Sequence, residues 1–230
     1  MEQETWHSIW ERKGVSGSRK TAYSQEELFA ANGYDTPLGR TTEAIRERML
    51  GKVVEVLAPG PGVSLLDAGC GSGAFLSMLG GTGAALSGAD FSESLVAIAR
   101  KALPGLDIRV AEAAKLPFAE GSFDAVLSHG VFLYFPNAEY ATRALLEMIR
   151  VTRGAARLFI SDIPDLAKKE QCLAARRAAG ASVVPEHLYL AKEFFEDFAS
   201  EHSLRVRIWD QDVPDYENTP YRFNVWFGKN

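Results

Sequence analysis

The sequence predicts a doubly wound α/β domain, in which helices cover both faces of a mostly parallel sheet. Short apolar runs alternate with helical segments between residues 63 and 161. These runs are apolar at nearly every position, as expected of strands that are buried on both faces. A glycine-rich segment stands between the first run and the next helix, where such folds bind ligands. The length of 230 residues suits a single domain with a sizeable core, and we expect residues 1–230 to form one.

Each element has its own signal in the sequence. Thr41 or Thr42 is a suitable N-cap for a helix that ends before Pro59, and Ser92 and Asn137 are suitable N-caps for two later helices. Gly154 is the expected end of the helix that begins at Asn137. Strands are predicted at 63–68, 84–90, 107–113, 122–130, 155–163, about 203–210 and about 221–228; helices at 42–57, 74–81, 92–103, 137–154, 165–180 and 191–203.

Composition restricts the function classes. With 30 acidic against 25 basic side chains, the chain lacks the cationic surface of a protein that follows a phosphate backbone. Two cysteines cannot form a disulfide framework, and the four histidines lack metal-ligand spacing, so we expect no metal. No signal peptide is evident, and the uncharged stretch 68–89 contains too many glycines for one membrane-spanning helix. We therefore expect a cytoplasmic enzyme.

The glycine-rich segment is the main candidate site. Gly69, Gly71 and Gly73 follow the strand that contains Asp67, and glycines at this place let the backbone turn sharply and approach a ligand. Asp90 ends the next strand, where a carboxylate can accept hydrogen bonds from ribose hydroxyls. Asp90 could alternatively be the N-cap of the helix that follows, but Ser92 is the better candidate for that position.

Two ligand classes share this arrangement. Gly69, Gly71 and Ala74 satisfy the weaker form of the dinucleotide fingerprint, so an NAD(P)-dependent oxidoreductase is the first alternative function. Such enzymes usually open with the fingerprint and carry a substrate domain of similar size, and neither feature is seen here. A phosphate-binding P-loop is excluded because no Gly-Lys-Ser/Thr follows the glycines.

Four motifs in the correct order decide between these classes. The Asp67 to Gly73 segment, the Asp90-Phe91-Ser92 segment, residues 112–118 and residues 121–126 together resemble class I S-adenosylmethionine-dependent methyltransferases. The resemblance covers about residues 63–161 and is strongest to the small-molecule branch that includes ubiquinone- and menaquinone-type methylases. It implies a Rossmann-like sheet of seven strands, mixed because the last strand is antiparallel.

The resemblance also implies roles for single residues. The glycine loop, including Cys70 as a small wall residue, would hold the methionine part of S-adenosylmethionine, with Asp67 toward its ammonium group. Asp90 would bind the ribose, and Phe91 would lie against the adenine. The remaining cofactor candidates are Glu112 and the Ala113 backbone near the adenine amino group, Ser128 and His129 near the methyl group, and Trp10. Most members of the family have Asp at the position of Glu112.

Catalytic residues are less well defined. His129 is the best-placed titratable group to act as a general base; the alternative is that it packs and forms hydrogen bonds at the end of a strand. Tyr134 could reach an acceptor or belong to the pocket wall. Trp6 and Trp10 lie on one helical face and predict either a lid over the sulfonium or a packed helix.

The acceptor is expected to be a small molecule, methylated on oxygen, nitrogen or carbon. The Asn/Asp-Pro-Pro-Tyr signature of methylases that act on adenine or glutamine is replaced by residues 128–131, which argues against a nucleic-acid acceptor. Residues 1–62 and 162–202 would cover the acceptor side, and residues 203–230 would form the terminal strand pair. Arg19 and Arg40 are weak candidates for the methionine carboxylate, and the basic residues 168–169 and 176–177 are interpreted as a solvated helix face. The second alternative is a protein that binds S-adenosylmethionine without catalysis.

Overall fold

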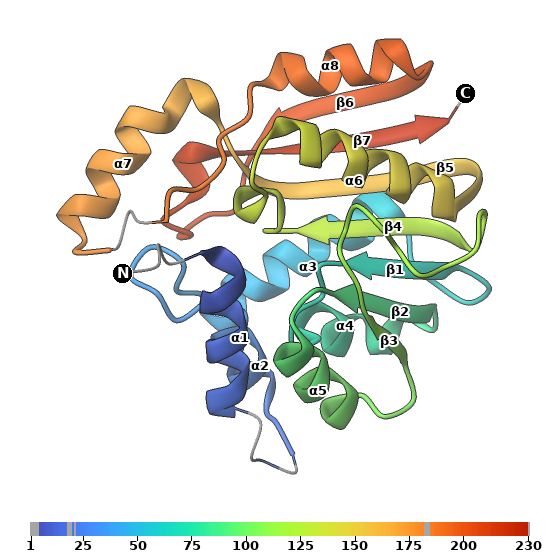
Figure 1. Cartoon of the computed structure of the whole chain (residues 1–230), viewed down its shortest axis with the longest axis horizontal. Helices are drawn as coiled ribbons and strands as arrows, with labels where there is room; N and C mark the ends of the chain where they lie inside the picture. The colour runs from blue at the N-terminus through green and yellow to red at the C-terminus, as the bar shows by residue number, and fades with distance from the viewer. Residues whose placement is uncertain (1–4, 18–19, 21, 182–184, 230) are drawn as a thin grey trace.

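A computed structural model of the chain describes residues 5–17, 20, 22–181 and 185–229. Its strands form one seven-stranded sheet in the order β3-β2-β1-β4-β5-β7-β6 (Figure 1). The strands are β1 Ser64–Ala68, β2 Ala85–Asp90, β3 Asp107–Val110, β4 Phe123–His129, β5 Thr152–Pro164, β6 Leu204–Asp210 and β7 Arg222–Lys229. The pairs among β1 to β5 are parallel, and β7 is antiparallel to both β5 and β6. The predicted mixed α/β sheet with an antiparallel last strand is confirmed.

The helices fall into three groups. On one face of the sheet lie α3 Glu43–Leu57, α4 Ala74–Leu79 and α5 Glu93–Ala102, and on the other lie α6 Ala138–Val151 and α8 Lys192–Glu201. Beyond the edge where the parallel strands end lie α1 Trp6–Gly17, α2 Gln25–Ala31 and α7 Lys169–Ala178 (Figure 1). Short 3₁₀ turns are η1 Gly80–Thr82, η2 Phe132–Tyr134, η3 Leu166–Lys168 and η4 Thr219–Tyr221.

The predicted N-caps are confirmed, and one predicted helix end is wrong. Thr42, Ser92 and Asn137 each accept a hydrogen bond from a backbone N–H in the first turn of α3, α5 and α6. Helix α6, however, ends at Val151 rather than at Gly154. Thr152 already pairs with β4, and its hydroxyl donates to a backbone carbonyl in the last turn of the helix, so β5 begins directly.

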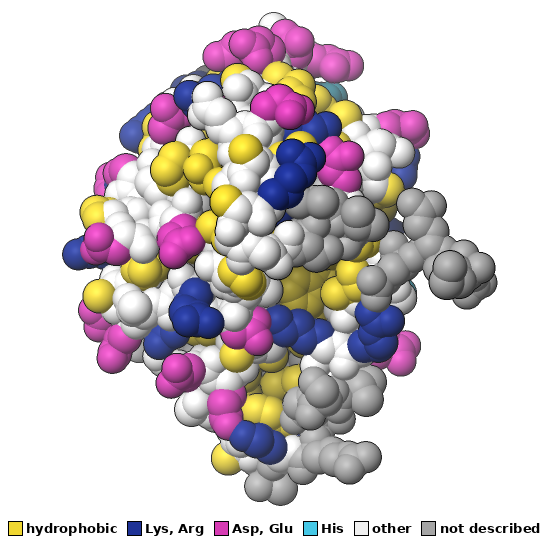
Figure 2. All heavy atoms as spheres, turned by 90° about the vertical axis from the view of Figure 1, so that its left-hand side faces the viewer, with side chains coloured by type: hydrophobic (Ala, Val, Ile, Leu, Met, Phe, Trp, Pro, Cys, Tyr) yellow, Lys and Arg dark blue, Asp and Glu magenta, His cyan; other side chains and the backbone are white. Residues whose placement is uncertain are grey.

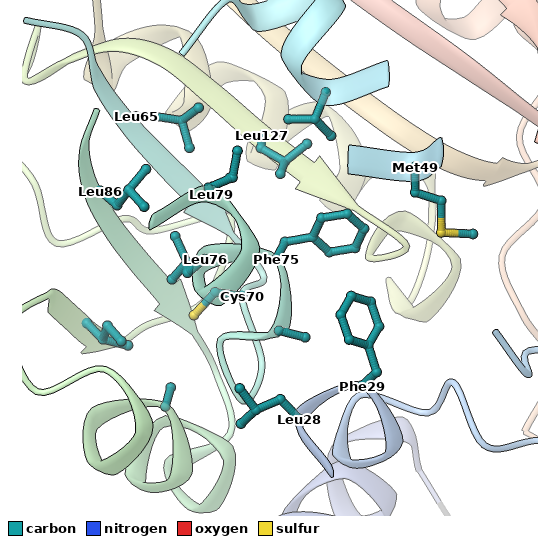
Figure 3. Packing of buried hydrophobic residues seen from close by; sticks show 14 of the residues in the cluster. Leu28, Phe29, Met49, Leu65, Cys70, Phe75, Leu76, Leu79, Leu86 and Leu127 are labelled. Atoms are coloured by element: carbon teal, nitrogen blue, oxygen red, sulfur yellow. The ribbon is translucent and has the colours of Figure 1, made fainter. Parts of the chain in front are cut away.

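Two apolar layers hold the helices to the sheet. Successive strand residues point to opposite faces, so Leu65 packs toward α3 and α4 while Leu66 packs toward α6. In the first layer, Phe29 of α2 and Phe75 of α4 make an edge-to-face contact at 5.6 Å (Figure 3). This contact ties the N-terminal segment to α4 and to the face of the sheet that α4 covers.

The topology places a crevice beside β1. The chain runs from β1 outward to β2 and β3 and then returns to form β4 on the opposite side of β1. The loops that follow β1 and β4 therefore leave the sheet in opposite directions, and a space opens between them. Any ligand site of this fold is expected at the carboxyl ends of β1, β2 and β4.

Gly73 provides a test of the loop that enters α4. It is the N-cap of α4 with a φ of 83°, and a Cβ there would approach the Leu103 side chain at 2.8 Å. We expect Gly73→Ala to lower the free energy of unfolding by about 1–2 kcal/mol, the cost of a left-handed conformation for an L-residue. Gly80→Ala is the matched control, because Gly80 has a φ of −53° and nothing within 4 Å of its Cβ position. Urea denaturation of both variants measures the difference, and equal stability of the two would contradict it.

Candidate functional site

A cavity of about 790 Å³ lies at the carboxyl ends of β1, β2 and β4. Most residues that the sequence marked as cofactor or catalytic candidates line it: Trp10, Asp67, Gly69, Cys70, Gly71, Asp90, Phe91, Glu112, Ala113, His129 and Tyr134. Two others are placed elsewhere. Gly73 caps α4, and the buried Ser128 hydroxyl donates to the Ala68 carbonyl at 2.9 Å, linking β4 to β1. The structure thus gathers residues from five separate segments around one space.

Asp90 holds the glycine loop in its turn. One carboxylate oxygen of Asp90 accepts the Gly71 N–H at 2.9 Å, and the other accepts the Ser92 N–H at 2.9 Å. The N–H groups of Gly69 and Cys70 both donate to the Ala89 carbonyl, at 2.7 and 3.0 Å. The carboxylate expected at a ribose therefore also organises the loop that carries the other binding groups.

Asn32 is a second support of the loop, and sequence reasoning missed it. Its side-chain oxygen accepts the Ser72 N–H at 2.8 Å and the Ser72 hydroxyl at 2.9 Å, and its amide group donates to the Cys70 carbonyl at 3.3 Å. A Cβ on Gly71, which has a φ of 53°, would collide with this amide. Asn32 follows α2, far from the loop in sequence, so only the tertiary fold reveals the contact.

Asp67 is buried without a counter-charge. Its side chain is 3% exposed, and the described part of the chain supplies no hydrogen-bond donor to its carboxylate. Burial, with a smaller contribution from the nearby Asp90 charge, raises the pKa of Asp67 to about 8. Burial likewise raises the pKa of Asp90 to about 6, against the hydrogen bonds from Ser92 and Gly71. Two carboxylates with raised pKa values side by side form a site that favours a cation.

Glu112 continues the acidic wall after β3. The Tyr140 hydroxyl, from α6, donates a hydrogen bond to the Glu112 carboxylate, and both residues line the cavity. Tyr140 fixes the longer side chain that stands where the resembled family usually has Asp. Tyr140 could not be singled out from the sequence, because its partner lies on another element.

His129 is buried and uncharged. Its Nδ1 shares a 2.6 Å hydrogen bond with the Ser161 hydroxyl on β5, and its ring packs against Phe75 with centroids 4.3 Å apart. Nε2 has no partner among the described residues. Burial lowers the pKa of His129 to about 3, so the imidazole is neutral at physiological pH. One ring nitrogen is thus available for a hydrogen bond with a ligand.

Helix α1 covers the cavity with aromatic rings. Trp6 and Trp10 both line it, and each makes an edge-to-face contact with Tyr134, at 4.9 and 5.0 Å between centroids. The Glu11 carboxylate accepts the Glu93 N–H at the N-terminus of α5 at 2.7 Å, which fastens α1 over the cavity.

Neither of the two arginines proposed for the methionine carboxylate is among the described residues that line the cavity. Arg19 lies outside the described residues, and Arg40 is exposed and does not line the space. The other lining residues that the sequence did not single out include Tyr34, Phe75, Leu95, Val131 and Phe135. These five are apolar or aromatic, and a sequence alone does not distinguish such residues from core.

A second cavity, of about 430 Å³, adjoins the first. Trp10, Tyr34, Gly130 and Tyr134 line both spaces, so they form the wall between them. The second cavity extends toward α7 and the loop before β7, where it reaches Arg176 and Arg222. Arg176 therefore does not belong only to a solvated helix face, as the charge pattern indicated.

Comparison with known proteins agrees with this geometry. A family model described as a methyltransferase domain matches residues 66–160, which include the end of β1, all of β2 to β4 and most of β5. The chain carries a class I S-adenosylmethionine-dependent methyltransferase domain. The solved magnesium protoporphyrin IX methyltransferase of Synechocystis PCC 6803 with bound S-adenosylhomocysteine has the same fold. Its TM-score is 0.64 at 18% identity, and the match covers 97% of this chain and 98% of that chain.

Curated relatives of the methyltransferase domain act on different acceptors. The demethylmenaquinone methyltransferase of Beutenbergia cavernae is 36% identical over 110 residues, 47% of this chain and 44% of that protein. The probable tRNA methyltransferase 9B of Mus musculus is 36% identical over 100 residues, 44% of this chain and 22% of that protein. The chain spans less than half the length of these relatives, and they do not support the expected exclusion of nucleic acid. Within the described residues, no helix has the length and apolarity to span a membrane.

S-adenosylmethionine fits the residues of the methyltransferase domain. The charged side chains among the described lining residues of the first cavity are all acidic: Asp67, Asp90 and Glu112. The cofactor carries a sulfonium and an ammonium group, so it supplies the cations that these buried carboxylates lack. Phe91, Trp6 and Trp10 add aromatic faces to the same space.

The raised pKa of Asp67 predicts that this residue lowers the stability of the folded state by an amount that depends on pH. Between about pH 4 and pH 8 the folded state binds this proton and the unfolded state does not, so the free energy of unfolding falls as pH rises. We expect the stability of Asp67→Asn relative to wild type to increase from pH 5 to pH 8, measured by urea denaturation. Asp124→Asn is the control, because hydrogen bonds from Ser64 lower the pKa of Asp124 and it stays ionised throughout this window. A constant Asp67→Asn difference would refute the prediction.

The neutral state of His129 can be observed directly. With a pKa of about 3, its imidazole nitrogens should keep the chemical shifts of the neutral ring from pH 8 down to pH 5 in ¹⁵N NMR. In urea-unfolded protein the same histidine should titrate near 6.5. His129→Gln assigns the signal. Titration of the native signal near pH 6.5 would show that His129 is accessible to solvent.

Proposed function

We propose that the protein transfers a methyl group from S-adenosylmethionine to a small-molecule acceptor. The observation that carries this proposal is the buried Asp67 carboxylate, which faces a cavity at the carboxyl end of β1 with no counter-charge among its described neighbours. When bound, S-adenosylmethionine supplies an electrophilic methyl group on a sulfonium. The protein's own task is to align the acceptor with that group and to exclude water.

Each part of the cavity has a separate task in this proposal. Asp67 binds the ammonium group, Asp90 the ribose hydroxyls, and Glu112 with the Ala113 backbone the adenine, while Gly69, Cys70 and Gly71 form the wall along the methionine part. Phe91 packs against the adenine, and Trp10 shields the sulfonium. Gly73 and Ser128 support the loop and β4 from outside the cavity.

His129 and Tyr134 stand on the side of the acceptor. A histidine with a pKa of about 3 is a weak base, so we assign His129 a hydrogen bond from Nε2 to the acceptor rather than a full charge. Desolvation raises the pKa of the half-buried Tyr134, so its hydroxyl remains a neutral hydrogen-bond donor. The pair then orients the nucleophile.

The small size of the acceptor is inferred from the second cavity. Its volume of about 430 Å³ suits a metabolite, and it is lined by residues of the segments 1–62 and 162–202 that we propose as the acceptor cover of a single domain. Its walls come from α1, the loop after α2, the turn η2, α7 and the loop before β7. The acidic composition of the chain supports a cytoplasmic small-molecule enzyme over one that binds tRNA.

Calorimetry separates this proposal from the dinucleotide alternative. The wild-type protein should bind S-adenosylhomocysteine and show no heat with NAD(H) or NADP(H). Asp90→Ala should weaken S-adenosylhomocysteine binding about 10- to 100-fold, because ribose hydrogen bonds and the support of the Gly71 N–H are lost together. Asp197→Ala, an exposed carboxylate on α8, is the control and should bind as wild type.

Several outcomes would contradict the proposal. Tight nicotinamide binding without S-adenosylhomocysteine binding would favour the oxidoreductase. Methyl transfer from labelled S-adenosylmethionine to tRNA, but to no member of a metabolite library, would exclude a small-molecule acceptor. Cofactor binding without transfer to either would leave a non-catalytic binding protein.

A further inference from the structure

The second cavity has a charge opposite to that of the first. Its charged lining residues in the described part of the chain are Asp162, together with Arg12, Lys13, Arg176 and Arg222. Figure 2 views the side of the molecule that includes α1 and α7, where hydrophobic side chains lie at the bottom of a hollow and Lys and Arg side chains lie near it. An excess of cations around an apolar space favours an anionic ligand.

Arg222, the first residue of β7, is the main cation of this cavity. It is 3% exposed, and its Nε and Nη1 atoms find no hydrogen-bond partner among the residues that the structure describes. Its nearest carboxylate oxygen is Asp162 Oδ1, 3.6 Å from Nε, which is too far for a hydrogen bond. Burying a guanidinium with unused donors is costly, so a ligand that accepts from them would recover part of that cost.

Asp162 forms a buried ion pair with Arg222, but its side-chain hydrogen bonds come from other residues. The Gln211 side-chain amide donates to Oδ1 at 3.0 Å, and the Tyr216 hydroxyl donates to Oδ2 at 3.4 Å. Asp162 also has a φ of 61° and lies at a shift of register between β5 and β7. Residues other than glycine adopt this backbone conformation only rarely. The guanidinium donors therefore remain available to a ligand.

The other walls define the rest of the ligand. Trp6, Trp10, Tyr34 and Tyr134 offer flat apolar faces, and His187 stacks on Trp6 with centroids 4.8 Å apart. Burial lowers the pKa of His187, so this ring adds no charge to the wall. An aromatic or unsaturated body fits these faces.

We propose that Arg222, with Arg176 beside the same cavity, binds a carboxylate of the methyl acceptor, which is therefore an aromatic or unsaturated monocarboxylic acid. This inference rests on the proposed function, because it makes the second cavity the acceptor subsite. The planar guanidinium matches a planar carboxylate with two parallel hydrogen bonds. A single negative charge is favoured over a phosphate dianion, because the Asp162 carboxylate lies close to the guanidinium.

Binding of matched probes tests the inference without catalysis. The full chain, saturated with S-adenosylhomocysteine, is titrated by calorimetry with naphthalene-2-carboxylate, naphthalene-2-carboxamide and 2-naphthyl phosphate. The carboxylate should bind about tenfold or more tighter than the amide, and tighter than the phosphate. The double variant Asp162→Asn/Arg222→Gln removes both charges together, so no buried charge is left unpaired, and it should bind carboxylate and amide within about twofold of each other.

Two further variants keep the result interpretable. Arg176→Gln changes a half-buried residue and should weaken carboxylate binding several-fold with amide binding unchanged, even where the double variant does not fold. Arg177→Gln, the exposed neighbour on α7, should keep the wild-type preference. Equal binding of carboxylate and amide by wild type, no binding of either, or tighter binding of the phosphate would overturn the inference. If S-adenosylhomocysteine binds and the carboxylate preference is absent, only this inference fails; if the preference appears without S-adenosylhomocysteine binding, the proposed function fails.

Discussion

The parallel pairing of β1 with β2 on one side and β4 on the other is the constraint on which the rest of the structure depends. It brings the carboxyl ends of these strands to one edge and sends their loops in opposite directions. The glycine loop, Asp90 and His129 meet there because each follows a strand of this set. The order of the strands therefore produces a site that has acidic groups on one side and a neutral imidazole on the other.

Holding the site in this form costs stability. Asp67 and the Arg222 guanidinium are both more than nine-tenths buried, and the described residues leave hydrogen-bonding capacity of each unused. A protein selected for stability alone would pair such groups or replace them with apolar residues. The apolar layers on both faces of the sheet offset that cost, and the contact between Phe29 and Phe75 shows that the N-terminal segment shares in them. A buried carboxylate without a counter-charge and a buried guanidinium with unused hydrogen-bond donors are therefore better explained by ligands than by folding.

Local signals in the sequence were sufficient to predict the secondary-structure elements of the molecule. Short apolar runs and capping residues gave the strands, helices and their order, because these depend on neighbours within a few positions. The prediction that the last strand is antiparallel came from the resemblance to the family. The prediction that α6 ends at Gly154 was wrong, because the pairing of Thr152 with β4 ends the helix earlier. Most cofactor candidates lie on one cavity because strand ends are ligand sites in this fold. Asn32 and Tyr140 were missed because their contacts with the glycine loop and Glu112 join distant parts of the chain. The same limit applies to Arg222, which looked like an ordinary strand residue, and to Arg176, which looked like part of a solvated face.

The two cavities differ in sign, and this difference has a physical consequence for their ligands. The first presents the carboxylates Asp67, Asp90 and Glu112, and the second presents more cations than anions, with aromatic side chains between them. A cationic cofactor would be attracted to the first cavity and repelled by the second, and an anionic acceptor the reverse. Binding of either ligand in the wrong cavity is therefore disfavoured by charge, without any steric selection. Once both are bound, their opposite charges attract through an aromatic wall of low polarity, where such attraction is stronger than in water. Trp10 and Tyr134 belong to both cavities, so the wall that separates the charges also lies where the two ligands would meet. In this arrangement, the acceptor's charge helps to hold the cofactor in place. The charges of the cavity walls determine which ligand each cavity binds.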